Sequence, residues 1–338
     1  MKKILCLLMI STAFSCTSQM ATVAPTNPTK YISSITSKDL KKHLTVVASD
    51  EMEGRETGSA GQKKAGNYLI NQYKSLGISF PKGANDYYQK IPAAFLSAKS
   101  RETLPDSENI WAFIEGSEKP EEIILISAHY DHIGLQNGQV YNGADDDGSG
   151  TVAILEIAEA FKLAIKEGYK PKRSILFMHM TGEEHGLLGS DYYSKNPLFP
   201  MTNTVTNINI DMIGRHDEFH TDSSDYVYLI GSDYLSTDLY TVCEDVNKKY
   251  INLKLDYKFN DRNDPNRFYY RSDHYNFAKN GVPSVFLFTG VHEDYHQASD
   301  EIDKIEFDAL ARRTQLAFAI AWDIANREHR PVVDKDGK

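Results

Sequence analysis

Histidines and carboxylates follow four of the apolar runs in this sequence, each time close to the end of the run. The groups are His129-Tyr130-Asp131-His132, Glu183-Glu184-His185, Asp211, and a loop carrying His292, Glu293, Asp294 and His296. A fifth group, Asp145-Asp146-Asp147, lies directly before Gly148-Ser149-Gly150. Imidazole nitrogens and carboxylate oxygens are the usual ligands of catalytic zinc. Burying so many carboxylates without cations costs several kcal/mol per charge, so the pattern predicts a divalent-metal site.

Each group by itself also has an ordinary explanation. A His-x-Asp pair is usually a hydrogen-bonded pair, adjacent glutamates in a loop are usually solvated, and the three aspartates before Gly148 could cap a helix. Unrelated surface charges, however, have no reason to gather at the ends of several strands. The metal hypothesis therefore rests on the joint pattern.

The apolar runs that precede these groups have the length of strands. They are apolar throughout instead of alternating, which is typical of strands buried between helices. The predicted strands are 109–115, 123–128, 174–180, 205–210, 226–230 and 284–288, and the predicted helices are 36–48, 59–76, 148–165, 234–250, 273–279 and 307–325. This order predicts a three-layer α/β/α sandwich with a mixed, largely parallel central sheet. Ligands of such sheets collect at the carboxyl ends of the strands.

The first 16 residues resemble an export signal. Lys2 and Lys3 precede an apolar run that is too short to span a bilayer, which needs about 20 residues. The run ends at Ser15-Cys16, like a bacterial lipoprotein cleavage box, although Ala13 stands where Leu or Val is usual; a signal peptide cut elsewhere is the alternative. We expect a signal peptide over 1–16, a tether over 17–30, one folded domain over 31–330 and a tail over 331–338. The protein would be exported, and periplasmic or anchored to a membrane of a bacterial cell envelope through Cys16.

The composition narrows the range of partners. The 338 residues include 37 Lys and Arg against 47 Asp and Glu, a net charge of −10. An acidic surface repels phosphates, so we expect no nucleic-acid partner and membrane contact only through a lipid on Cys16. Three cysteines are too few for a disulfide framework or a four-cysteine zinc site. No feature of the sequence indicates an obligate protein partner.

The order of the metal-binding groups resembles that of the co-catalytic di-zinc exopeptidases. This family includes bacterial leucyl aminopeptidases, glutaminyl cyclases and glutamate carboxypeptidases, and the resemblance covers roughly residues 36 to 325. The matching motifs are Ser127-Ala128-His129-Tyr130-Asp131, Asn142 to Gly150, Thr181 to Ser190, Asn209-Ile210-Asp211-Met212, Ser272-Asp273-His274, and Tyr295 to Asp300.

The resemblance implies two zinc ions per chain and a zinc peptidase fold. The implied ligands are His129, Asp146, Glu184, Asp211 and His296. One ion would be held by His129 and Glu184, the other by Asp211 and His296, with Asp146 bridging both. The family pattern also implies a cis peptide bond between Asp146 and Asp147.

Three further residues are expected to serve the reaction. Glu183 is the candidate general base, because the adjacent Glu184 is committed to metal. Asp131 would accept a hydrogen bond from the second ring nitrogen of His129 and fix its tautomer. Tyr269 matches a family tyrosine near the developing oxyanion, with Tyr270 as a rival.

The remaining histidines are expected to be ordinary. His179 lies inside a predicted strand and belongs in the core, whereas His43, His216, His220 and His329 have polar neighbours and belong on the surface. The others, His132, His185, His274 and His292, would line the substrate cleft without binding metal.

The expected function is a zinc aminopeptidase that removes N-terminal residues from peptides with a free N-terminus. A water shared by the metal pair would attack the peptide bond, with Glu183 as the base. Glutaminyl cyclase, which typically uses one zinc, is an alternative, as is a glutamate-type carboxypeptidase, whose usual inserted domains would need more room than lies between Gly77 and Ile123. A metal-binding module without catalysis is a third alternative, and the retention of Glu183 argues against it.

Overall fold

The strands of the computed structural model, which describes residues 27–336, form one large sheet and one small hairpin. The sheet contains β1 (Tyr88–Ile91), β2 (Ser107–Ile114), β3 (Lys119–His129), β6 (Arg173–Met180), β7 (Thr204–Ile210), β8 (Tyr226–Ile230), β9 (Lys254–Asp256) and β10 (Ser284–Phe288), and the hairpin contains β4 (Gly134–Gln136) and β5 (Gln139–Tyr141). The order across the sheet is β1-β2-β6-β3-β7-β10-β8-β9.

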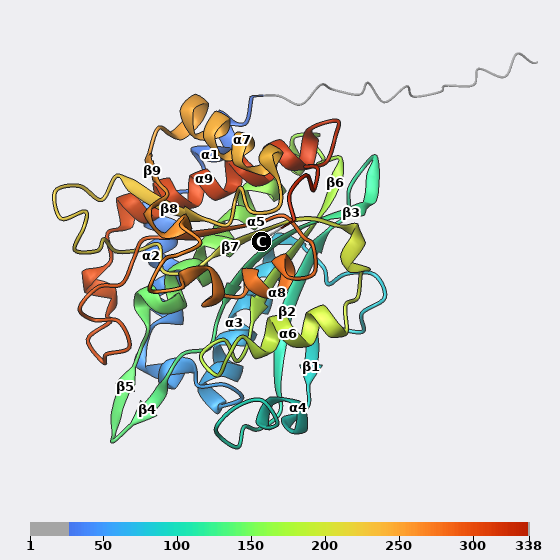
Figure 1. The fold of residues 1–338 in the computed structure, drawn as a ribbon. Coiled ribbons are helices and arrows are strands. Elements are labelled where there is room, and N and C mark those ends of the chain that lie inside the picture. The colour runs from blue at the N-terminus through green and yellow to red at the C-terminus, as the bar shows by residue number, and fades with distance from the viewer. Residues whose placement is uncertain (1–26, 337–338) are drawn as a thin grey trace, which may run out of the picture.

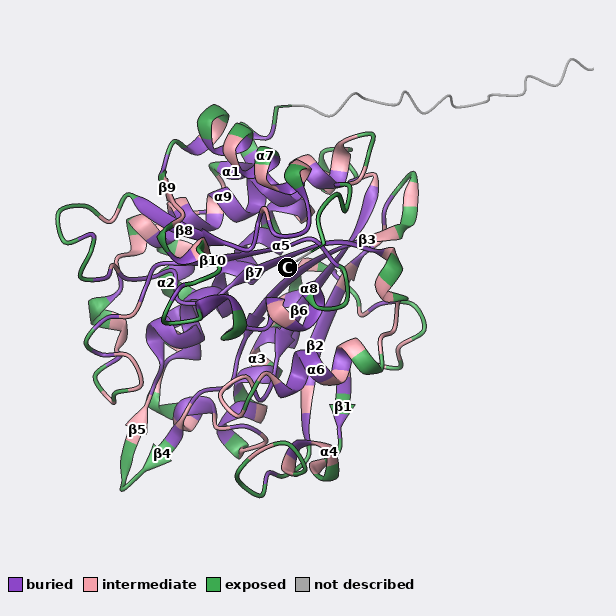
Figure 2. Cartoon of the chain, viewed as in Figure 1, coloured by how far each residue is buried: buried purple, intermediate pink, exposed green. Residues whose placement is uncertain are grey.

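The centre of the sheet is parallel. β6, β3, β7 and β10 run in one direction, whereas β2 and β8 flank them in the opposite direction. β6, β7 and β10 are buried at every position, as their unbroken apolar runs predict, and Figure 2 shows the contrast with the exposed β4–β5 hairpin. Because the four central strands are parallel, the residues that follow them meet at one edge of the sheet.

Helices cover both faces of the sheet (Figure 1). One face carries α1 (Thr29–Ile32), α2 (Ser37–Val47), α3 (Ala60–Leu76), α5 (Gly150–Lys166), α7 (Thr237–Val246) and α9 (Phe307–Asn326). The other carries α6 (Leu188–Lys195) and α8 (His274–Ala278), and α4 (Ala93–Ser97) lies between β1 and β2 along the chain. The predicted three-layer sandwich is confirmed. None of the helices within residues 27–336 has the length and hydrophobicity that a membrane span requires.

Local sequence signals determine where several helices begin and end. The side chain of Thr36 caps α2, and Ser59 caps α3. Gly77 ends α3 with a φ of 65°, a left-handed conformation that favours glycine. The predicted helix over 234–250 is shorter than expected, because α7 ends at Val246 and a wider turn, Asn247–Ile251, follows it.

The export signal and Cys16 lie outside the described residues, so those predictions stay predictions. The helix α1 begins at Thr29, which the domain prediction assigned to the tether.

Two histidines expected on the surface are buried. His220 stacks on Tyr226, with ring centroids 3.4 Å apart. His43 lies between helices, with Nδ1 2.7 Å from the Tyr68 hydroxyl and Nε2 3.4 Å from Glu156 Oε1. Burial lowers the pKa of His43 to about 4 and raises the pKa of Glu156 to about 8, so both side chains are uncharged near neutral pH. Polar sequence neighbours did not reveal this burial, because the contacts come from three separate helices.

The raised pKa of Glu156 predicts that the stability of the protein depends on pH. Its folded pKa of about 8 lies above the ordinary value of 4.5, so between these values the folded protein binds more protons than the unfolded chain. Stability therefore falls as pH rises through this window. His43 acts oppositely, but only below its ordinary value of 6.5. The free energy of unfolding of the parent should fall between pH 6.5 and pH 9. That of Glu156→Gln should fall by roughly 1–2 kcal/mol less over the same range, as measured by urea unfolding.

The control is Glu121→Gln, which changes an exposed glutamate of β3. It should follow the parent at every pH. Equal slopes for the parent and Glu156→Gln would contradict the burial of a protonated Glu156.

Candidate metal centre

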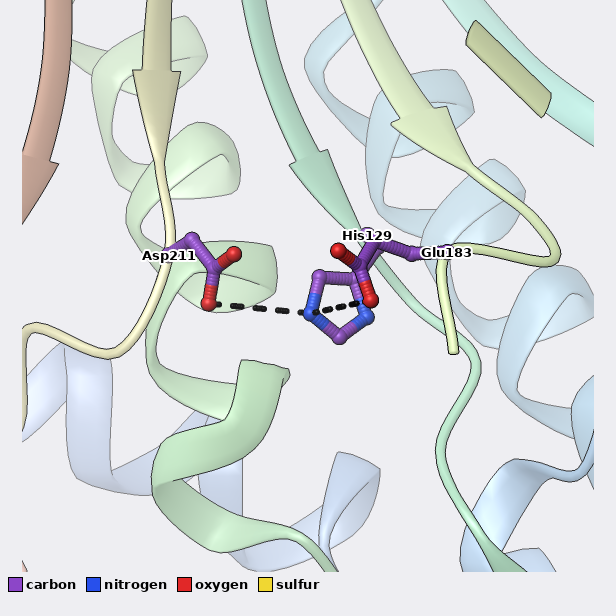
Figure 3. A group of neighbouring side chains, drawn as sticks. All are labelled: His129, Glu183 and Asp211. Atoms are coloured by element: carbon purple, nitrogen blue, oxygen red, sulfur yellow. Dashed lines mark ion pairs between the residues drawn. The ribbon is translucent and has the colours of Figure 1, made fainter. Parts of the chain in front are cut away.

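Two of the predicted ligands and the predicted general base lie at the carboxyl ends of parallel strands. His129 is the last residue of β3, and Asp211 follows the last residue of β7. Glu183 follows β6 after a turn at Gly182, whose φ is 69°. Figure 3 shows the three side chains converging below the tips of their strands, with the His129 ring between the two carboxylates. His129 Nε2 is 3.6 Å from Asp211 Oδ1 and 4.0 Å from Glu183 Oε2, spacing that suits ligands of one cation.

Asp146 lies between two histidines. One of its oxygens, Oδ1, is 3.2 Å from His129 Nε2, and the other, Oδ2, is 3.2 Å from His296 Nε2. His296 Nε2 is in turn 3.0 Å from Glu184 Oε2. The structure therefore brings all five predicted ligands to one place. Their nitrogen and carboxylate donors fit divalent zinc.

The predicted distribution of these ligands is wrong. The structure places His129 beside Asp211 and His296 beside Glu184, instead of His129 with Glu184 and Asp211 with His296. β3 and β7 are neighbours in the sheet, which brings their carboxyl ends together. The strand order, which the sequence does not display, decides the pairing.

His132 has a more direct place in the site than the sequence suggested. Its ring is buried, with Nδ1 2.8 Å from Glu184 Oε1 and 3.8 Å from Asp146 Oδ2. These three residues form a second group that could hold a cation. The other neighbouring histidines have different partners: His185 pairs with Glu56, and His292 approaches Asp145. The proximity of His132 to His129 in the sequence was the available signal.

The Asp146 loop is held by main-chain hydrogen bonds. The carboxylate of Asp300 accepts from the amides of Asp145 and Asp146, all at 3.1 Å. The carboxylate of Asp147 accepts from the amides of Gly150, Met212 and His129, at 2.9, 3.1 and 3.2 Å. The peptide bond between Asp146 and Asp147 is cis, which confirms that prediction. The loop thus ties the start of α5 to the ends of β3 and β7.

Ser272 supports Asp211 from the opposite face of the sheet. Its hydroxyl donates to Asp211 Oδ2 at 2.6 Å and accepts from the side-chain amide of Asn209 at 2.7 Å. This contact gives the Ser272-Asp273-His274 motif a physical role, because it fixes the orientation of a predicted ligand.

Arg55 is a functional residue that the sequence did not reveal. It is fully buried, and its guanidinium donates to four main-chain carbonyls, those of Val47, Tyr130, Asn142 and Gly143, at 2.6–3.0 Å. Asn142 and Gly143 begin the Asp146 loop. Burial lowers the pKa of Arg55, but the surrounding aspartates, Asp300 first, act against this. Arg55 therefore supplies hydrogen bonds to the Asp146 loop and a positive charge close to Asp300 and Asp146.

Asp131 is placed differently from the prediction. His129 Nδ1 lies 3.1 Å from the main-chain carbonyl of Asp131, whereas the Asp131 carboxylate is 3.8 Å away, beyond hydrogen-bond range. The carboxylate instead accepts from the Thr57 hydroxyl at 2.8 Å and from the amide of Glu183 at 3.3 Å. Asp131 still orients the site, but through its carbonyl and through the Glu183 main chain.

The two adjacent glutamates differ in their protonation. Burial raises the pKa of Glu183 well above its usual range, and the Glu184 and Asp211 carboxylates add to this against the opposing effect of His129. Burial acts on Glu184 in the same direction, but hydrogen bonds with His132 and His296 prevail and lower its pKa to about 2. Glu183 is therefore the carboxylate that can hold a proton, and Glu184 is the one that stays ionised.

The metal centre opens into a cavity of about 390 Å³. One side is formed by His129 and the carboxylates, and the other by an apolar wall of Met212, Phe268, Phe286, Phe288 and Val291. Tyr295 and Arg271 complete the lining within the described part of the chain. Tyr269 is buried against Tyr234, with ring centroids 4.3 Å apart, and neither it nor the exposed Tyr270 lines the cavity. That a tyrosine assists the reaction stays a prediction. The tyrosine that lines the cavity is Tyr295.

The sequence model of peptidase family M28 matches residues 109–321. A probable leucine aminopeptidase of Arthroderma otae is 31% identical over 64% of this chain and 57% of its own length. A probable glutamate carboxypeptidase of Arabidopsis thaliana is 28% identical over 64% of this chain and 30% of its own. The chain thus spans little more than half of one curated relative and less than a third of the other.

The LapA aminopeptidase structure of Legionella pneumophila has a TM-score of 0.67. At 20% identity, over 89% of this chain and 75% of LapA, this likeness shows the fold.

The contacts of Arg55 predict a large loss of stability on its removal. Arg55→Met removes the guanidinium hydrogen bonds of four main-chain carbonyls, of which that of Gly143 keeps the Gly148 amide as a donor, and it removes the positive charge beside Asp300 and Asp146. We expect the free energy of unfolding to fall by about 3 kcal/mol or more, measured by urea unfolding. Arg101→Met, at an exposed arginine, should change it by less than about 0.5 kcal/mol. A loss below about 1 kcal/mol for Arg55→Met would show that the loop does not depend on this guanidinium.

Proposed function

This chain belongs to peptidase family M28, and from that premise we propose that it is a zinc-dependent aminopeptidase acting on peptides with a free N-terminus. The observation that carries the proposal is the position of Asp146. Its two oxygens face two different histidines at equal distances, as a carboxylate shared by two cations must. A single-cation site would have no use for this arrangement.

Two zinc ions per chain are proposed, with the ligands grouped by the distances between their side chains. One would be held by His129, Asp146 and Asp211, and the other by Asp146, Glu184 and His296. Zinc bound there would lower the pKa of a water and polarise the scissile carbonyl. His132 would hold the Glu184 carboxylate in place through its hydrogen bond.

Glu183 is the residue that moves the proton. Its carboxylate faces the cavity beside His129, and its main chain is anchored by Asp131. Because Glu183 is not among the proposed ligands, its carboxylate is free to take a proton from water and to return it to the leaving amine. Glu184, whose pKa is lowered, cannot replace it in this role.

A preference for free amines is part of the proposal, and its support is the similarity to a probable leucine aminopeptidase. This preference separates the proposal from the alternatives in the family. A carboxypeptidase would act on blocked peptides, and a glutaminyl cyclase would convert an N-terminal glutamine without releasing an amino acid.

Export from the cytoplasm and an anchor at Cys16 are proposed as well. Their support is the charged start, the short apolar run and Cys16 of the sequence. Radioactive fatty acid should label the full chain in cells but not a Cys16→Ser variant, and equal labelling would remove the anchor.

The activity is tested with leucine anilide and its N-acetylated form. The protein should release aniline from the free-amine substrate and at least about 100-fold more slowly from the acetylated one, and a chelator should abolish both. Faster cleavage of the acetylated substrate would refute an aminopeptidase.

The adjacent glutamates offer a matched pair of variants. Glu183→Gln should lower kcat by about 100-fold or more while retaining about two zinc per chain, because it removes the base and leaves the ligands. Glu184→Gln should lose zinc, measured by elemental analysis after dialysis. If Glu183→Gln keeps kcat within about tenfold of the parent, the base is another group.

A further inference from the structure

Arg271 places a positive charge in the lining of the cavity and forms no ion pair with the proposed metal ligands. Among the described residues that line the cavity it is the only lysine or arginine. Four carboxylates line the same cavity, and three of them, Asp146, Glu184 and Asp211, are proposed zinc ligands whose charge the cations would offset. A guanidinium in the same lining suits an anionic group of the substrate.

The side chain of Arg271 is held in place but keeps free donors. Its guanidinium lies 4.9 Å from the centre of the Phe268 ring and donates to the Tyr295 hydroxyl at 3.2 Å. Tyr295 stacks on His296, with ring centroids 3.9 Å apart, so Arg271 is connected to the metal side of the cavity. Within residues 27–336 no ion pair joins Arg271 to a carboxylate, and the residue is exposed. Stacking and one hydrogen bond orient the guanidinium, and its other N–H groups donate to no acceptor among the described residues.

An oriented guanidinium with free donors matches a carboxylate. Its planar fork can donate two parallel hydrogen bonds to the two oxygens. Because Phe268 and Tyr295 already hold the side chain, little side-chain entropy is lost on binding. Arg271 lines the same cavity as His129 and Asp146, so a substrate carboxylate close to the scissile bond lies within its reach.

We propose that Arg271 binds a carboxylate of the substrate and makes the enzyme selective for peptides that carry one next to the scissile bond. This proposal rests on the aminopeptidase function above. The carboxylate has two possible sources, which share the same chemistry. It is the C-terminal carboxylate of a dipeptide or the side chain of an acidic N-terminal residue, while the apolar wall accepts an aliphatic or aromatic side chain in the first case.

The test compares three substrates that carry a carboxylate at different places or not at all. Leucyl-glycine carries a terminal carboxylate, leucyl-glycinamide carries none, and glutamyl-glycinamide carries one on its side chain. Values of kcat/KM are measured for the parent and for Arg271→Met. The matched control is Arg267→Met, because Arg267 stacks on the exposed Tyr270 ring at 4.8 Å and does not line the cavity. Zinc content is measured for each variant and should be equal.

We expect the parent to favour one carboxylate substrate over leucyl-glycinamide by at least about tenfold. Arg271→Met should abolish that ratio, and Arg267→Met should keep it. Loss of the preference for leucyl-glycine identifies the terminal carboxylate, and loss of the preference for glutamyl-glycinamide identifies the side chain. Unchanged ratios in Arg271→Met, or an equal fall for all three substrates, overturn the role of Arg271 while leucyl-glycinamide hydrolysis still supports the aminopeptidase. A parent that hydrolyses none of the three overturns both.

Discussion

Mutual repulsion among buried carboxylates is the constraint that shapes this molecule. Asp145, Asp146 and Asp147 are all buried at the edge where the ends of the parallel strands converge. The chain offsets the repulsion with main-chain amides directed at Asp147 and Asp300, and with the buried guanidinium of Arg55. Divalent cations between the carboxylates would complete the balance. The many hydrogen bonds of the loop are thus a consequence of its charge.

Much of this arrangement can be predicted from the sequence. Unbroken apolar runs identify the parallel strands, and the groups that follow them identify the edge where His129, Glu183 and Asp211 meet. The cis bond after Asp146 follows from the family resemblance. These features are local, because a strand and the residue after it are adjacent in the chain. The short strands β1 and β9 escape prediction, since three or four residues carry too little periodicity.

Features that depend on the spatial order of elements cannot be predicted in this way. The pairing of His129 with Asp211 follows from β3 and β7 being neighbours. The role of Arg55 depends on carbonyls, which every residue carries and which leave no mark in the sequence. Arg271 likewise gains its meaning only from the cavity that surrounds it. The sequence shows which side chains are present, whereas only the fold shows which of them lie close together.

The position of Arg55 along the chain has a consequence for the boundaries of the folded unit. The segment that the family model matches begins at residue 109, yet the guanidinium that holds Asn142 and Gly143 comes from well before it. The amino-terminal segment is therefore part of the same folded unit as the matched residues. A chimera that joins residues 109–321 to a foreign amino-terminal half would have to supply an equivalent cation at the same depth.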